Sequence, residues 1–338
     1  MPQKPKILVV GSFVMDLIVK AGRFPNAGET VLGFEYQMAP GGKGANQAAQ
    51  AARIGADVTM VGRVGDDDFG RKLIRSCREA GVHTDFVGVD RGACSAVGNV
   101  QLEVGNGTTR NRIIVVPGAN MTIRPEHVAF LKDTIGQYDM VILQLEIPMQ
   151  IDEIIAGYAY EKHIPVMLNP APSARLSTGL LSHLTYISPN EHEMADLTGI
   201  PIRKDGKSVN MDDVHRAVDA LLSKDVRNVV VTLGNAGAVV ANKEEFLYEP
   251  CIDIVKVKDP TAAGDSFVGA FSASLCAGLS RRDALHFANY AATLTVSRLG
   301  AQPSLPKMDE VVALMKREND LTFDLSFLDG LKQKGETA

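Results

Sequence analysis

The 338 residues are 45% hydrophobic and 22% charged, a balance typical of a globular protein with a sizeable buried core. With a net charge of -5 and no basic stripe, we do not expect nucleic acid or a membrane surface as the main partner. The four cysteines follow no zinc-binding or disulfide spacing, and no apolar run reaches the roughly 20 residues that span a bilayer, so we expect a cytoplasmic protein.

Short runs rich in β-branched residues alternate with helical patterns along the chain, and each run ends in polar residues or glycine. The runs are KILVVGS (6–12), DVTMVGRVG (57–65), DMVILQLE (139–146), IPVMLNP (164–170), LTYISPN (184–190) and NVVVTLG (228–234). This alternation predicts an α/β fold whose mainly parallel sheet is covered by helices on both faces. In such sheets ligands bind beyond the carboxyl ends of the strands.

Two segments, about 13–38 and 94–119, interrupt the alternation and resemble short antiparallel strands. Asn106-Gly107 stands between two alternating runs and is a strong hairpin signal. We expect the two segments to pair into a small β-stranded lid over the ligand face. The pattern predicts one domain over 1–310, followed at 311–338 by a C-terminal helix and a loosely attached polar tail.

The stretch APGGKGANQAAQAA (39–52) places glycines around Lys43 immediately before a helix. Glycines let a ligand approach the backbone, and a helix N-terminus favours anions or hydroxyl oxygens. A tight turn ahead of a surface helix is the alternative for such a pattern. Asn46, in the first turn of the helix, favours a polar ligand.

The stretch DPTAAGD (259–265) also leads into a helix. Successive amides of its small residues can form a nest for an oxyanion, with Asp265 placed to take a proton from an attacking hydroxyl. The alternative is that Asp265 caps the helix, a contribution of about 1 kcal/mol. A cap does not need the preceding run of tiny residues, so the pattern favours catalysis, with capping in addition.

Two further stretches lie at expected strand ends. In PNEHE (189–193), Asn190 and Glu193 share one helical face, where they could contact a ligand or form a capping box. TLGNAG (232–237) is typical of a strand, a glycine turn and a second strand. A nucleotide-contacting turn and a plain hairpin are equally compatible with it.

In this order, GGKGANQ, PNE, DPTAAGDSF and RLGAQPS resemble the ribokinase-like carbohydrate kinases, the phosphofructokinase-B family, over about residues 7–305. The resemblance implies a three-layer α/β/α sandwich with a lid. It also implies transfer of the γ-phosphate of ATP to a sugar hydroxyl, the leading acceptor being the 5-hydroxyl of D-ribose. Mg²⁺ and K⁺ as cofactors, and a homodimer formed through the lid, are implied as well.

The resemblance assigns roles residue by residue. Asp265 would be the catalytic base, and the anion hole would be made by the amides of Ala262, Ala263 and Gly264. The sugar would be held by Asp16, Gly42, Lys43, Asn46 and Glu146. The nucleotide would contact Asn190, Thr232, Gly234, Asn235, Ala236, Gly237, Gly264 and Asn289. Glu193 would act on Mg²⁺ through water, and K⁺ would be held by Asp259, Thr261, Thr295, Arg298, Gly300 and Ser304.

One position departs from the family pattern. Members that act on ribose typically read GSxNxD after the first strand, whereas this chain reads GSFVMD, with Val14 in place of the asparagine. A site built to bond a hydroxyl rejects an analogue without it by roughly 10⁴-fold, while an apolar pocket discriminates weakly. We therefore expect Val14 to shift the preference toward 2-deoxyribose, unless Val14 points into the core of the lid. A non-catalytic sugar-binding protein of this fold would lack Asp265 or Gly264, and both are present.

Overall fold

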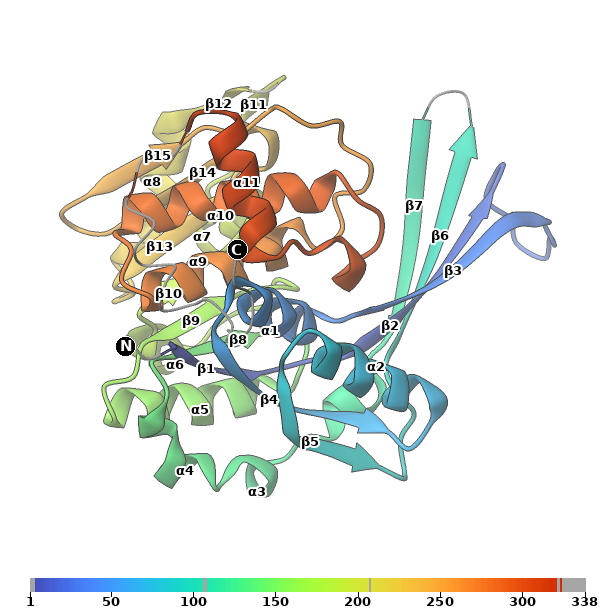
Figure 1. The fold of residues 1–338 in the computed structure, drawn as a ribbon, viewed down its shortest axis with the longest axis horizontal. Coiled ribbons are helices and arrows are strands. Elements are labelled where there is room, and N and C mark those ends of the chain that lie inside the picture. The colour runs from blue at the N-terminus through green and yellow to red at the C-terminus, as the bar shows by residue number, and fades with distance from the viewer. Residues whose placement is uncertain (1–3, 106–107, 207, 321–322, 324–338) are drawn as a thin grey trace.

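The computed structural model describes residues 4–105, 108–206, 208–320 and 323 (Figure 1). Within them, the predicted mainly parallel sheet is confirmed, with nine strands in the order β15-β14-β13-β10-β9-β8-β1-β4-β5. The strands from β13 to β5 run parallel, and β14 and β15 extend the sheet as an antiparallel hairpin. The strands are β1 (Lys6–Val10), β4 (Asp57–Gly65), β5 (His83–Asp90), β8 (Met140–Gln144), β9 (Val166–Asn169), β10 (Tyr186–Ile187), β13 (Asn228–Thr232), β14 (Ala238–Ala241) and β15 (Phe246–Glu249).

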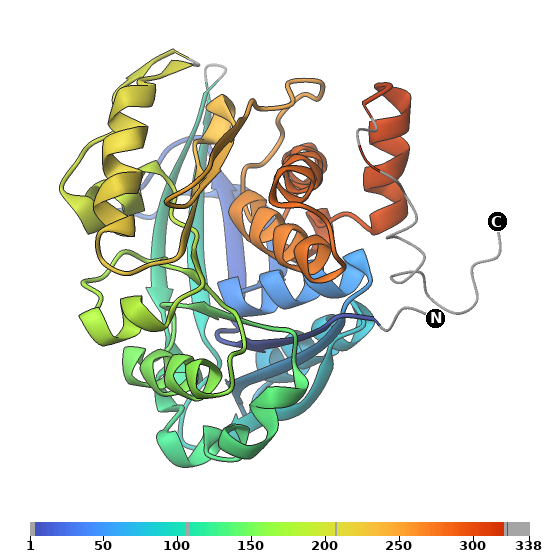
Figure 2. The ribbon, with the colours of Figure 1, turned by 90° about the vertical axis from the view of Figure 1, so that its left-hand side faces the viewer.

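Helices cover both faces of this sheet, which gives the three expected layers (Figure 2). One face carries α1 (Lys43–Ile54), α2 (Asp68–Glu79), α9 (Ala263–Cys276), α10 (Arg281–Val296) and α11 (Met308–Arg317). The other carries α3 (Pro125–Val128), α4 (Leu131–Thr134), α5 (Met149–Glu161), α6 (Thr178–His183), α7 (Glu191–Thr198) and α8 (Met211–Leu222). Side chains of β1 alternate between the two cores, because successive residues of a strand point to opposite faces: Ile7 and Val9 join one, and Leu8 and Val10 the other.

A second sheet, the lid sheet, projects from the body with the strand order β3-β2-β6-β7 (Figure 1). Its strands are β2 (Val14–Ala21), β3 (Gly33–Gly41), β6 (Val97–Gly105) and β7 (Thr108–Val116). The pairs β2·β3 and β6·β7 are antiparallel as predicted, but β2 and β6 pair in parallel, so the expectation of antiparallel strands throughout is wrong. Both strands leave the body in the same direction, which makes their contact parallel. The predicted Asn106-Gly107 turn lies outside the described residues, although Gly105 and Thr108 on either side pair.

The C-terminal helix α11 begins at Met308, and the chain just beyond it is attached to α10. The Tyr290 hydroxyl donates to the Asp320 carboxylate at 2.7 Å, and a ring nitrogen of His286 lies 3.3 Å from the same group. The polar tail therefore starts as an anchored segment, and most of its remainder lies outside the described residues. A short hairpin of two strands with two residues each, β11 (Lys204–Asp205) and β12 (Ser208–Val209), lies before α8. In the described ranges, every helix is too short or too polar to cross a membrane.

Candidate active site

The turn before α1 is packed directly against the chain that follows β1. Gly42 has φ 93°, a left-handed conformation that favours glycine, and a Cβ there would lie 2.7 Å from the amide nitrogen of Val14. A Cβ on Gly44 would lie 2.5 Å from the amide nitrogen of Ser12. The two glycines are thus required by backbone packing, in addition to any ligand. Their close approach brings the first turn of α1 to the end of β1.

Asp265 faces this turn from α9 and is held by two side-chain amides of α1. Asn46 Nδ2 donates to Asp265 Oδ2 at 2.8 Å, and Gln47 Nε2 donates to Oδ1 at 2.9 Å. All three side chains are buried, and Asn46 Oδ1 has no hydrogen-bond partner among the described residues. A buried unpartnered acceptor costs free energy, about 1–3 kcal/mol, unless a ligand or water supplies a donor. Asn46 therefore offers an acceptor to a hydroxyl-bearing ligand beside the Asp265 carboxylate.

Two strand ends supply amides that the motifs did not reveal. Gln144 Nε2, at the end of β8, donates to Gln47 Oε1 at 2.8 Å, and Gln47 Nε2 reaches Asn169 Oδ1, at the end of β9, at 3.2 Å. This network fixes the orientation of Gln47 and through it the Asp265 carboxylate. The sequence signal for both residues was a polar amide closing a buried apolar run.

The start of α9 differs from the capping hypothesis. The helix begins at Ala263, its N-cap residue is Ala262, and Asp265 is the third residue of the helix, so the expectation that Asp265 caps it is wrong. Ala262 has φ 62°, a left-handed conformation that costs an alanine about 1 kcal/mol. That turn points the Ala263 amide at the Pro260 carbonyl, 3.2 Å away. Within the described residues the amides of Ala262 and Gly264 have no partner, and a Cβ on Gly264 would meet open space.

Carboxylates and one ammonium gather around this point. Glu146 Oε2 accepts from the Ser12 hydroxyl at 2.5 Å and from the Lys43 amide at 2.9 Å. Burial, followed by Glu146, Asp265 and Asp259, raises the pKa of Asp16 to about 7. For Lys43, burial lowers the pKa, but the carboxylates of Asp265, Glu146 and Glu193 outweigh it, and the pKa is raised. Lys43 thus carries a positive charge close to carboxylates of the expected sugar, catalytic and nucleotide positions.

Val14 lies on the face of the lid sheet that carries Asp16. A Cβ on Gly98, the β6 neighbour of Asp16, would lie 2.3 Å from Asp16 Oδ1 and 3.6 Å from Val14 Cγ1. Met15 points to the other face and joins the hydrophobic core, with Leu17 packed against the same core, whereas Val14 belongs to none of the core clusters of the described residues. Val14 is itself buried, with 6% of its surface exposed, and a role for it in sugar selection stays a prediction.

Asn190 and Glu193 form the capping box that was one of the two alternatives for this stretch. Asn190 Oδ1 accepts from the Glu193 amide at 2.9 Å, and Glu193 Oε2 accepts from the Asn190 amide at 2.8 Å. Burial raises the pKa of Glu193. Asn190 also bridges to Thr232, whose amide donates to the Pro189 carbonyl at 3.0 Å. The two predicted nucleotide contacts are therefore adjacent at neighbouring strand ends.

The glycine turn after β13 is a short 3-10 turn, Gly234–Ala236, that leads into β14. Gly237 has φ 103°, and a Cβ there would lie 2.1 Å from the Glu249 carbonyl oxygen, so hairpin packing alone demands glycine. Asn235 is exposed. On α10, Asn289 Nδ2 donates to the Pro250 carbonyl at 3.3 Å.

Apart from Thr295, which lies in the last turn of α10, the residues expected to hold K⁺ lie in two segments that Asp259 ties together. Its Oδ1 accepts from the Thr261 amide at 2.9 Å and its Oδ2 from the Gly300 amide at 3.0 Å. The Ser304 hydroxyl donates to the Ala301 carbonyl at 2.7 Å, which leaves its oxygen lone pairs available. The Arg298 guanidinium instead pairs with Glu310 at 2.5 Å, and the Thr295 hydroxyl is turned into the core, so only their carbonyls could serve a cation.

A doubly covered parallel sheet with a buried carboxylate, free amides and a lysine at its strand ends is the architecture of an α/β enzyme that acts on a small polar substrate. The model of the pfkB family carbohydrate kinases matches residues 4–308. The chain belongs to this family, and it is a ribokinase-type carbohydrate kinase.

Individual relatives cover nearly the whole chain. A ribokinase from Lactococcus lactis is 38% identical over 312 residues, which are 92% of this chain and 97% of the relative. A deoxyribokinase from Salmonella typhimurium is 30% identical over 305 residues, 90% of this chain and 96% of the relative. The structure of Arabidopsis thaliana ribokinase complexed with ribose and ATP matches with a TM-score of 0.84 at 32% identity, over 93% of this chain and 99% of that one.

Proposed function

We propose that this chain transfers the γ-phosphate of ATP to the 5-hydroxyl of D-ribose, giving ribose 5-phosphate and ADP. The observation that carries the proposal is the Asp265 carboxylate, which two amides of α1 orient beside the unpartnered Asn46 Oδ1. The ribokinase relatives, among them a structure described with ribose and ATP, support ribose as acceptor and ATP as donor.

In this proposal Asp265 accepts the proton of the attacking hydroxyl as the new O–P bond forms and the bond to the leaving ADP breaks. Phosphoryl transfer depends mainly on positioning and on stabilisation of charge. The partner-free amides of Ala262 and Gly264 stabilise the transferring phosphoryl group, and the Ala263 amide contributes once it leaves the Pro260 carbonyl. The Lys43 ammonium adds positive charge near the same point.

The sugar lies between the lid sheet and α1. Asp16 accepts hydrogen bonds from two vicinal hydroxyls, Asn46 accepts from a third, and the Gly42 backbone forms one wall. Glu146 contributes indirectly as well, because its carboxylate fixes the Lys43 amide and the Ser12 hydroxyl. The partial burial of Asp16 without a hydrogen bond to any described side chain supports a ligand in that position.

The nucleotide lies over the ends of β10 and β13, where it contacts Asn190, Thr232, Asn289 and the turn 234–237. Both Glu193 carboxylate oxygens accept from Asn190, which fits contact with Mg²⁺ through water. One carboxylate with several carbonyls and a hydroxyl suits a monovalent cation at Asp259, Thr261, Thr295, Arg298, Gly300 and Ser304. When bound, Mg²⁺ would neutralise phosphate charge and K⁺ would brace the loops beside the anion hole.

A 2-deoxyribose kinase is the second candidate. It is favoured by Val14, an apolar side chain on the face of the lid sheet that carries Asp16. The 30% identity to a deoxyribokinase is lower than the 38% identity to a ribokinase, so ribose remains the leading acceptor.

We also propose that two copies associate through the lid. On the face opposite Asp16, the lid sheet exposes a patch of large apolar side chains: Phe34, Tyr36, Met38, Ile114 and Val116. Phe34 is 63% and Ile114 66% exposed, and large apolar side chains exposed in this number on one face of a sheet favour an interface. A second lid sheet, which carries the same apolar patch, matches it chemically.

The test is release of ADP with Mg-ATP and K⁺, comparing kcat/KM for ribose and 2-deoxyribose. A strong ribose preference supports the proposal, comparable or better use of 2-deoxyribose supports the second candidate, and turnover of neither refutes both. Asp265→Ala should lower kcat by at least ~10³-fold. The matched control is Asp283→Ala. Asp283 is the third residue of α10, as Asp265 is of α9, so this variant removes a carboxylate from the equivalent helix position and should leave kcat unchanged. Unchanged turnover in Asp265→Ala would remove Asp265 from the role of base.

A further inference from the structure

A chain of buried hydrogen bonds runs beneath the site, from α10 through α9 to α1. The Thr295 hydroxyl lies 2.8 Å from the Ser266 hydroxyl, and the Ser266 hydroxyl donates to Gln50 Oε1 at 3.2 Å. Gln50 Nε2 then donates to the Pro306 carbonyl at 3.1 Å. The side chains of Thr295, Ser266 and Gln50 are completely buried. The Thr295 hydroxyl also lies 3.0 Å from the Ala291 carbonyl of its own helix, so the Ser266 hydroxyl and this carbonyl compete for its single proton.

This chain of hydrogen bonds through Thr295, Ser266 and Gln50 is called the relay below. It reaches the first turn of α9 beside the reacting carboxylate, because Ser266 directly follows Asp265. On α1, Gln50 lies one turn beyond Asn46 and Gln47, which hold Asp265 itself. The helices are in backbone contact here: a Cβ on Gly269 would lie 2.7 Å from the Gln47 carbonyl oxygen. Two successive turns of α1, one with Asn46 and Gln47 and the next with Gln50, are therefore hydrogen-bonded to the start of α9.

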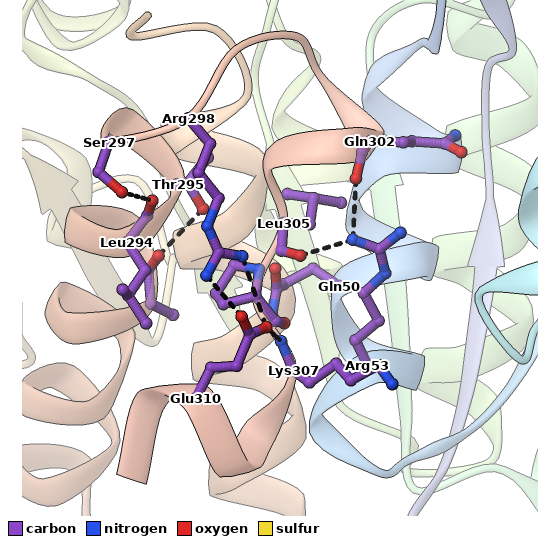
Figure 3. Close-up of polar contacts among 12 residues, drawn as sticks. Gln50, Arg53, Leu294, Thr295, Ser297, Arg298, Gln302, Leu305, Lys307 and Glu310 are labelled. Carbon is purple, nitrogen blue, oxygen red and sulfur yellow. Dashed lines mark hydrogen bonds and ion pairs between the residues drawn. The ribbon is translucent and has the colours of Figure 1, made fainter. Parts of the chain in front are cut away.

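Both ends of the relay, Thr295 and the Pro306 carbonyl, lie in the segment 295–306, which α1 also contacts through a second residue. Arg53, one turn beyond Gln50, donates to the Gln302 carbonyl at 2.9 Å and to the Leu305 carbonyl at 2.5 Å (Figure 3). In the same view the Arg298 guanidinium points to Glu310 on α11. The segment is thus fixed at both ends, and the relay is its hydrogen-bonded connection to the helix that bears Asp265.

We propose that Gln50, Ser266 and Thr295 are positioning residues for the phosphoryl transfer: their buried relay sets the first turn of α9, and with it Asp265 and the anion-hole amides, relative to α1 and the segment 295–306. The inference rests on the proposed function and deepens it. A displacement of about 1 Å at a reacting group can cost as much as ~10²-fold in rate, so the loss of one link is sufficient to slow the reaction.

A purely structural role is the alternative, and α9 contains its own control. The Ser274 hydroxyl, two turns further along, is equally buried but donates only to the Ala270 and Phe271 carbonyls of its own helix. Ser266→Ala and Ser274→Ala remove the same atom from the same helix. Only the first breaks a connection between helices. Thr295→Val removes the next link, keeps the side-chain shape, and tests the same relay if Ser266→Ala does not fold.

The experiment measures kcat and both KM values of Ser266→Ala, Thr295→Val, the double variant and Ser274→Ala. We expect kcat to fall about tenfold in each relay variant, with both KM values within about twofold of wild type. The double variant should be no slower than the slower single variant, because the links act in series. Ser274→Ala should keep kcat. The proposal would be overturned if the losses in kcat of the two single variants multiplied in the double variant. Equal kcat in Ser266→Ala and Ser274→Ala would also overturn it.

Amide hydrogen exchange gives a readout that does not depend on turnover. In the ligand-free protein, residues 261–265 should exchange faster in Ser266→Ala and Thr295→Val than in wild type, and at the wild-type rate in Ser274→Ala. The expected exchange rates do not depend on which sugar the wild type phosphorylates. The exchange experiment therefore separates failure of the relay from failure of the proposed function. Wild-type exchange at 261–265 in both relay variants contradicts the relay.

Discussion

The Asp16 carboxylate stands where a side chain on Gly98 would begin, since a Cβ on Gly98 would lie 2.3 Å from Asp16 Oδ1. On the other side of β2, a Cβ on Gly41 would lie 2.8 Å from Oδ2. The two neighbouring strands of the lid sheet thus accommodate the carboxylate by carrying no side chain beside it. The need for glycine at both positions is one of space, because neither has a positive φ.

Gly98→Ala should therefore displace Asp16 and weaken sugar binding. We expect the KM for the sugar to rise at least ~10-fold while the KM for ATP stays within about twofold, because a Cβ at 2.3 Å cannot coexist with the carboxylate. Steady-state kinetics with each substrate varied in turn measures both constants. The control is Gly22→Ala, just past the end of β2, where an added Cβ meets no described residue within 4 Å. Equal sugar KM values in the two variants would contradict this reading.

The raised pKa of Asp16 predicts a pH dependence of sugar use. At a pKa of about 7 the free enzyme loses the ionised carboxylate as pH falls, so kcat/KM for the sugar should decline below about pH 7. At saturating sugar, kcat should decline less. Asp16→Asn should have low kcat/KM without this acidic limb. An unchanged limb in Asp16→Asn would assign it to another group.

The same shift has a consequence for stability. Between the ordinary pKa of 3.8 and about 7, the folded chain keeps a proton on Asp16 that the unfolded chain has released. The free energy of unfolding therefore falls as pH rises through this window. Asp16→Asn cannot ionise, so it should raise Tm more at about pH 8 than at about pH 5. Thermal melts at the two pH values measure the difference, and an equal shift at both would contradict the assignment.

The sequence predicted the layers and the strand ends well because both follow from local patterns. Apolar runs such as the one at 139–146 identify buried strands, and GGKG and TAAG identify helix starts with open backbone. The parallel contact of β2 and β6 could not be read in this way. It depends on where two segments about 80 residues apart leave the body, which is a property of the tertiary structure.

For the site residues too, local patterns were predictable and contacts between distant segments were not. Asp265 was found through its local motif, but its role as a cap was wrong, because the left-handed turn at Ala262 starts the helix three residues earlier than a cap at Asp265 requires. Gln47 and Gln144 were missed, since their function lies in a contact between α1 and β8 that no local pattern encodes.

Val14→Asn should restore discrimination for the 2-hydroxyl. An amide on the Asp16 face can bond a hydroxyl that 2-deoxyribose lacks, and the unpaired amide then disfavours the deoxy sugar. We expect the ratio of kcat/KM values, ribose over 2-deoxyribose, to rise at least ~10-fold. Val19→Asn places the same substitution on the opposite face of β2 and should leave the ratio unchanged. A ratio that shifts equally in both variants removes Val14 from the sugar site.

The apolar patch of the lid sheet predicts a dimer that one charge can break. Tyr36→Glu introduces a carboxylate between Phe34 and Met38 of the patch, where burial against a second copy would leave it unpaired. We expect light scattering coupled to size exclusion to give twice the chain mass for wild type and one chain mass for this variant. Tyr160→Glu makes the same change at a tyrosine on α5 that is 47% exposed, and it should stay dimeric. A monomeric wild type would refute the interface.

Glu193→Gln separates the capping role of this residue from a role with Mg²⁺. Glutamine keeps one acceptor for the Asn190 amide, so the helix loses at most one of two hydrogen bonds and Tm should fall only slightly. Loss of the charge should instead lower kcat at limiting Mg²⁺ by at least ~10-fold, with partial recovery at high Mg²⁺. Ser177→Ala, which removes the cap of α6, should lower Tm by a similar or larger amount without affecting kcat. If Glu193→Gln loses only stability, as this control does, then Glu193 is a cap and nothing more.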